Sequence, residues 1–148
     1  QGRVLVTPLH MAMIAGAIAN DGMMMEPRLM LSATTAQGAS RMLMPSRTYK
    51  RVCSPADAQA LKSYMVACVE KGTGAQAKIK GTLVGGKTGS AETSNDKSIK
   101  THAWFVGFVD SGEHPLAIAV LVERGGGGGS IAAPLAQRVL SRAISLGY

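Results

Sequence analysis

The sequence predicts an α/β protein of the α+β type, in which helices flank an antiparallel sheet. Apolar residues follow helical spacing in three segments, whereas the chain between the second and third of them follows strand patterns. The 148 residues are 46% hydrophobic and 17% charged, which is typical of a packed globular protein rather than a disordered one. We therefore expect one domain, or part of one, over residues 1–148.

Three helices are predicted from signals at their ends. A Thr or Ser that can cap free backbone N–H groups, followed by proline, opens each of the first two, and Asp57 completes the form of a capping box with Ser54. Glycine follows both, as is typical of helix ends. The predicted helices run from Thr7 and Pro8 to Asn20, from Ser54 and Pro55 to Gly72, and from about Ile131 to Leu146 with Pro134 in the first turn.

Three strands are predicted between the second and third helices. Leu83 to Thr93 contains a Lys-Thr-Gly segment, His102 to Asp110 is rich in aromatic and β-branched residues, and Leu116 to Val122 is an unbroken apolar run. The short connection from Ser111 to His114 predicts an antiparallel hairpin of the last two. An unbroken apolar strand is normally covered on both faces, so helices are expected on both sides of the sheet.

The run Gly125 to Gly129 is interpreted as a loop rather than a linker between domains. The sheet before it and the helix after it each have an apolar side to bury, and each can cover the other.

The net charge of +7 does not predict a nucleic-acid partner. Lysine and arginine are spread along the chain, aromatic residues make up only 4%, and no nucleic-acid motif occurs. We interpret the charge as a solvated basic surface. No apolar run reaches the ~18 residues of a membrane span. Cys53 and Cys68 are not expected to form a disulfide, because the predicted helix holds them far apart.

The segment Gly81 to Thr88 fits two motifs with unrelated chemistry. It spells G-x-x-x-x-G-K-T, the phosphate-binding loop, and it also contains Lys-Thr-Gly, an element of penicillin-recognising serine acyltransferases. A phosphate loop needs a buried strand before it and a helix starting at its lysine. Ala77 to Lys80 is too polar for that strand, and Gly89 to Asn95 is a poor helix start. The flanks therefore favour a Lys-Thr-Gly strand, where glycine allows a ligand to approach the backbone.

Residues Val84 to Glu92 resemble the third active-site motif of the class B penicillin-binding proteins, the D,D-transpeptidases that cross-link peptidoglycan. Thr7 to Ala12 and Ile18 to Gly22, ahead of Pro27, resemble the helix and loop that precede this motif in the family. His102 to Phe108 resembles the strand after it. The resemblance covers almost the whole chain and implies a penicillin-binding, serine β-lactamase-like transpeptidase fold.

The resemblance implies roles for four residues of the motif. Lys87 matches the lysine that helps organise proton transfer and attracts the carboxylate of the donor peptide or of a β-lactam. Thr88 and Ser90 match positions whose hydroxyls contact the ligand, and the Ser90 backbone N–H matches an oxyanion-hole donor. Gly89 leaves room for the ligand along the strand. The implied ligands are the peptidoglycan stem peptide and β-lactams, with no metal or organic cofactor. His102 and Trp104, on the next strand, are interpreted as packing residues.

The chain departs from the family at the nucleophile. The family uses a serine in Ser-x-x-Lys at a helix start, followed by Ser-x-Asn. Ser-x-Asn does not occur here, and Ser94 to Lys97 lies after the third motif in a polar loop, so we interpret that match as coincidence. We therefore expect residues 1–148 to be the C-terminal portion of a transpeptidase domain, inactive alone, whose exposed apolar face packs against the missing N-terminal half or favours self-association. The family also implies an extracytoplasmic, membrane-anchored location.

A D,D-carboxypeptidase or β-lactamase-like hydrolase of the same fold is a related alternative, disfavoured because Thr7 to Pro27 resembles class B. Two functions from other classes also remain open. One is a non-catalytic sensor or binding module that kept the fold and lost the nucleophile, which the sequence upstream of Gln1 would distinguish. The other is a nucleotide-binding protein that uses Gly81 to Thr88.

Overall fold

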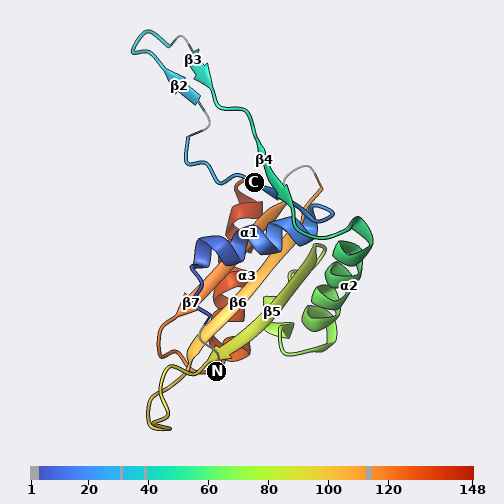
Figure 1. Cartoon of the computed structure of the whole chain (residues 1–148), viewed down its shortest axis with the longest axis vertical. Helices are drawn as coiled ribbons and strands as arrows, with labels where there is room; N and C mark the ends of the chain where they lie inside the picture. Colours follow the sequence, from blue (N-terminus) through green and yellow to red (C-terminus); the bar gives the residue numbers. More distant parts are fainter. Residues whose placement is uncertain (1–3, 31, 39, 113–114) are drawn as a thin grey trace.

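The structure is a computed structural model that describes residues 4–30, 32–38, 40–112 and 115–148. Figure 1 shows a sheet with helices around it and a ribbon that extends away from it. Along the chain the elements are α1 (Pro8–Ala19), β1 (Met23–Met25), β2 (Ser32–Thr34), β3 (Ser40–Leu43), β4 (Thr48–Arg51), α2 (Pro55–Lys71), the 3-10 turn η1 (Ala75–Ala77), β5 (Leu83–Ala91), β6 (His102–Asp110), β7 (Leu116–Val122), the π-helical turn η2 (Gly128–Ala132) and α3 (Ala133–Ser145).

The main sheet is antiparallel, and its last two strands pair, as the sequence predicts; the strand order is β5-β6-β7. Strands β6 and β7 have the predicted bounds, and the connection between them includes residues 113 and 114, which lie outside the described residues. Strand β5 ends at Ala91 rather than at Thr93, because its last partner, His102, is the first residue of β6. Beyond Ala91 no residue of β6 remains to pair with the chain.

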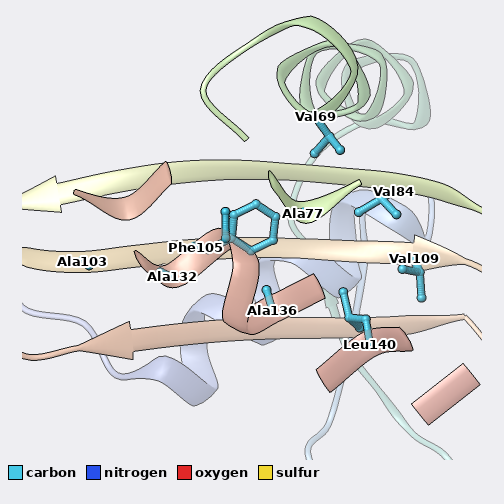
Figure 2. Packing of buried hydrophobic residues seen from close by; sticks show 10 residues of the cluster. Val69, Ala77, Val84, Ala103, Phe105, Val109, Ala132, Ala136 and Leu140 are labelled. Atoms are coloured by element: carbon cyan, nitrogen blue, oxygen red, sulfur yellow. The ribbon is translucent and has the colours of Figure 1, made fainter. Parts of the chain in front are cut away.

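Helices cover both faces of this sheet, which confirms the predicted fold class. Figure 1 shows α1 across one face, α3 behind the other, and α2 beside the outer strand β5. The core between α3 and the sheet is a single cluster to which α2 contributes Val69 (Figure 2). Its members are Val69, Ala77, Val84, Ala103, Phe105, Val109, Ala132, Ala133, Ala136 and Leu140.

The helix ends follow the local signals in the sequence. The Thr7 side chain accepts a hydrogen bond from the His10 backbone N–H at 3.2 Å and caps α1. Ser54 caps α2 by accepting from the Asp57 N–H at 3.1 Å. The Ser54 hydroxyl also donates to the Asp57 carboxylate at 2.6 Å. The Asp57 side chain is shorter than the Glu or Gln usual at this position of a capping box, and it contacts the side chain of the cap residue. The predicted apolar face of α2 is covered only in part, since Leu61 is exposed.

The glycine run connects β7 to α3 within one packed unit, and its backbone lies against the sheet. A Cβ atom on Gly128 would stand 2.4 Å from the carbonyl oxygens of both Gly89 and Trp104, closer than real Cβ atoms come. Ile131, where the third helix was expected to begin, lies in η2, and α3 begins at Ala133. Glycine at position 128 is therefore required by the direct contact between η2 and the β5–β6 pair.

The chain from β1 to β4 forms two small antiparallel sheets, β1–β4 and β2–β3. The β2–β3 pair stands away from the main sheet in Figure 1. Residues 23–51 thus form short strands that do not pair with the main sheet.

Substitution Gly128→Ala is expected to destabilise the protein by about 1–3 kcal/mol, because a methyl group there must displace the backbone of β5 or β6. Gly127→Ala is the matched control, since its Cβ would meet only the Ser130 hydroxyl, the end of a mobile side chain, and its φ of −78° suits alanine. Urea unfolding of both variants measures the effect. Equal midpoints for the two would show that the backbone contact is not needed.

Candidate active site

The Lys-Thr-Gly-Ser segment lies on β5, an outer strand of the described main sheet. Side chains alternate between the two faces of a strand, so Thr88 and Ser90 share the face of buried Val84, and Lys87 points to the opposite face. Strand β6 fixes the register, with Lys87 opposite Val106 and Gly89 opposite Trp104. The four predicted site residues therefore follow one another along an edge strand, which pairs with β6 on one side only within the main sheet.

Lys87 places a positive charge at this strand. Its side chain is exposed, and its Nζ donates a hydrogen bond to the Thr88 carbonyl oxygen at 2.7 Å. None of the ion pairs among the described residues involves Lys87. The ammonium group is thus held beside the backbone of the motif without a carboxylate to neutralise it, an arrangement suited to attract an anionic ligand.

Two hydroxyls of the motif contact neighbouring segments on the other face. The Thr88 hydroxyl lies 2.7 Å from the hydroxyl of Thr73, in the loop after α2. The Ser90 hydroxyl accepts a hydrogen bond from the Gly128 backbone N–H at 3.3 Å. The sequence did not predict a role for Thr73. Thr73 and Thr88 are 15 residues apart, and no local pattern indicates that the end of α2 contacts β5.

Gly89 is packed closely on both of its sides. A Cβ atom there would lie 3.2 Å from the Trp104 Cβ, and the Gly89 carbonyl oxygen occupies the space that a Gly128 side chain would need. The structure therefore gives a packing reason for this glycine, in addition to the ligand access that the sequence predicts.

A cavity of about 360 Å³ opens beside the motif, on the face of the sheet that carries α1. Its lining is almost entirely apolar, and Lys87 is its one charged residue. The lining residues are Val6, Met11, Ile14, Ala15, Ile18, Met65, Lys87, Thr88, Gly89, Trp104 and Val106. The motif thus borders an apolar hollow that α1 and α2 leave unfilled.

The structure does not support a phosphate-binding loop at Gly81 to Thr88. A continuous strand runs through the lysine from Leu83 to Ala91, where that loop would require a helix to begin. Gly81 has a φ of +79° and lies in the turn before this strand. The nucleotide-binding interpretation is therefore wrong.

The Ser-x-x-Lys match at Ser94 to Lys97 lies in irregular chain without a helix. The Ser94 hydroxyl accepts from the Asp96 N–H at 3.1 Å, while the Lys97 ammonium pairs with Glu92 at 3.2 Å. Serine and lysine thus have separate partners here, as expected for a coincidental match. The Ser98 N–H, which donates to the Asp96 carboxylate at 2.9 Å, holds the pKa of Asp96 below its ordinary value.

His102 has a structural hydrogen bond. Its Nδ1 accepts from the Arg124 backbone N–H at 2.9 Å, which links the start of β6 to the turn after β7. Trp104 lines the apolar cavity and stands opposite Gly89. Both residues support neighbouring segments of the site, in agreement with their interpretation as packing residues.

Among the residues that the structure describes, no group of three or more His, Cys, Asp or Glu side chains could hold a metal ion. None of the described helices combines the length and apolar character needed to cross a membrane. Cys53 and Cys68 are both free and half-buried.

The chain matches the family described as "Penicillin binding protein transpeptidase domain" over residues 1–141. It is 35% identical to the peptidoglycan D,D-transpeptidase PbpA of Mycolicibacterium smegmatis, over 99% of this chain and 31% of that protein. It is 29% identical to the peptidoglycan D,D-transpeptidase MrdA of Haemophilus influenzae, over 95% of this chain and 24% of that protein.

Solved structures give the same relationship. The ceftriaxone acyl-enzyme complex of penicillin-binding protein A from Mycobacterium tuberculosis superposes with a TM-score of 0.86 at 35% identity, over 95% of this chain and 33% of that one. The D,D-transpeptidase domain of a peptidoglycan glycosyltransferase from Eggerthella lenta gives a TM-score of 0.83 at 33% identity, over 94% and 32%. The chain therefore spans about a third or less of the length of these relatives, and it belongs to the penicillin-binding protein transpeptidase domain family.

Proposed function

We propose that residues 1–148 form the C-terminal portion of a serine D,D-transpeptidase domain that cross-links peptidoglycan stem peptides and binds β-lactams. The observation that carries this proposal is the Lys87 to Ser90 motif on an open strand, in a chain of this family. Relatives named peptidoglycan D,D-transpeptidase and a relative solved as a ceftriaxone acyl-enzyme support both the reaction and the ligand class.

Each motif residue has a proposed role in binding the donor peptide or a β-lactam. Lys87 attracts the ligand carboxylate and helps organise proton transfer, and the hydroxyls of Thr88 and Ser90 contact the ligand. The Ser90 backbone N–H donates to the oxyanion that develops on the reacting carbonyl. Gly89 lets the ligand lie along β5. The exposed ammonium beside the strand and the row of small residues after it support these assignments.

The nucleophile is proposed to lie upstream of these residues. A serine there would attack the donor carbonyl and form the ester of an acyl-enzyme, while the donor C–N bond breaks and the terminal amino acid leaves as an amine with the serine proton. The amine of a second peptide would then attack the ester, forming the new amide bond and returning a proton to the serine oxygen. Two features support this division: the chain covers only 31% of PbpA and 24% of MrdA, and Ser94 and Lys97 do not form the required pair. Alone, the chain would hold a binding strand without a nucleophile.

The upstream part of the domain is proposed to pack against apolar surface that this chain leaves open. The cavity beside Lys87 is one such surface, and a larger apolar hollow of about 780 Å³ lies between α1 and the start of β7. Three leucines are also exposed: Leu5 in the chain before α1, Leu9 on α1 and Leu61 on α2. Contiguous apolar surface of this kind is typical of an interface. An isolated chain is expected to cover it by self-association.

The protein is proposed to act outside the cytoplasmic membrane, anchored through a segment that does not belong to residues 1–148. Relatives that act on peptidoglycan support this location, since their substrate is a component of the cell wall.

Acylation of the longer protein tests the proposed function. We expect penicillin to form a covalent adduct on an upstream serine of Ser-x-x-Lys, located by peptide mass. Lys87→Ala is expected to slow the adduct about 100-fold or more, because it removes a charge that stabilises the reacting ligand. Lys80→Ala, an exposed lysine outside the motif, is the control and is expected to react at the unchanged rate. A folded protein without any adduct would favour the non-catalytic sensor.

The isolated chain gives a second test. Residues 1–148 are expected to form no penicillin adduct, even at Ser94, and to sediment as oligomers whose fraction rises with concentration. A labelled serine within this chain would contradict the upstream nucleophile, and a strictly monomeric chain would contradict the proposed apolar interface.

A further inference from the structure

The side chains of Cys68, Thr73 and Thr88 form a row of hydrogen-bonding groups that ends on the motif strand. The Cys68 Sγ lies 3.7 Å from the Thr73 Oγ1, and the Thr73 Oγ1 lies 2.7 Å from the Thr88 Oγ1. In both contacts either atom can act as the donor. The row begins in α2, passes through the loop that follows it, and ends within the motif.

The end of α2 holds Thr73 in this row. The backbone N–H groups of Gly72 and Gly74 both donate to the Cys68 carbonyl oxygen, at 3.0 and 3.1 Å, and this tight turn brings Thr73 next to β5. On the other side, a Cβ on Gly129 would lie 2.5 Å from the Thr73 carbonyl oxygen and 3.8 Å from the Thr88 methyl carbon. The loop is therefore packed between a helix end and the glycine-rich segment.

The direction of the bond between the two hydroxyls decides what Thr88 can do. A hydroxyl has one proton to donate and two lone pairs that accept. If Thr88 donates to Thr73, its oxygen can only accept from a ligand. If Thr73 donates to Thr88, the Thr88 proton remains available for an anionic ligand.

We propose that Thr73 is a positioning residue that donates its hydroxyl proton to Thr88 and so directs the Thr88 proton toward the ligand carboxylate. The Cys68 thiol can donate to Thr73 in turn, which gives the whole row one direction from α2 to the ligand. Hydrogen bonds in such a row polarise one another, and a bond to a charged acceptor is stronger than one to a neutral acceptor. The inference rests on the proposed function, because it needs a ligand bound along β5.

The test compares two variants of the longer protein with two ligands, penicillin G and its methyl ester, which lacks the negative charge. Thr73→Val keeps the shape and removes the hydroxyl, whereas Thr73→Ser keeps the hydroxyl. We expect Thr73→Val to lower the second-order acylation rate about tenfold with penicillin G but at most about twofold with the ester. Thr73→Ser is expected to retain the rate with both. Thr73→Ala replaces Thr73→Val if that variant fails to fold.

A double substitution separates positioning from general support of the fold. If Thr73 acts through Thr88, Thr73→Val is expected to have no further effect in a Thr88→Val background. Equal losses with both ligands, full activity of Thr73→Val, or additive losses in the double variant would each overturn the inference. If the unchanged protein forms no adduct with penicillin G, the proposed function fails and this inference fails with it. If the unchanged protein is acylated and substitutions at Thr73 do not alter the rate, the inference about Thr73 is contradicted while the proposed function stands.

Discussion

The direct backbone contact of Gly128 with Gly89 and Trp104 is the constraint on which the arrangement of the site depends. It joins the start of the last helical segment to the β5–β6 pair at the position of the motif. Any side chain on Gly128 would force these backbones apart. Helix α3 begins only a few residues later, and its buried residues belong to the core cluster. The same contact therefore also fixes the position of the motif strand relative to that core.

The motif strand is consequently supported from behind and open in front. Behind it, Thr73 contacts Thr88 and the Gly128 N–H donates to Ser90, so two separate segments contact successive side chains on the face of β5 that carries Val84. In front, Lys87 borders an apolar cavity and forms no ion pair within the described residues. Contacts that support one face of β5, together with an unfilled cavity on the other face, suit a strand against which a ligand and the rest of a domain dock.

The sequence was sufficient where the signals were local. Thr7 and Ser54 cap their helices through groups three residues away, and the bounds of β6 and β7 follow from an aromatic and β-branched run and from an unbroken apolar run. Tertiary contacts could not be foreseen in this way. The exposure of Leu61, the bond between Thr73 and Thr88, and the function of the glycine run all depend on segments far apart in the sequence. The motif residues themselves were identified by resemblance, and their chemistry stays a proposal.

A crystal structure of the longer protein acylated by penicillin G tests the assignment of this chain most directly. We expect the acyl carbonyl oxygen to accept a hydrogen bond from the Ser90 N–H and the ligand carboxylate to lie beside Lys87 and Thr88. The upstream part of the domain is expected to cover the cavity that α1 and α2 line. An acyl group that lies away from β5, or a cavity left open to solvent in that structure, would contradict the assignment of this chain as the binding strand of a transpeptidase.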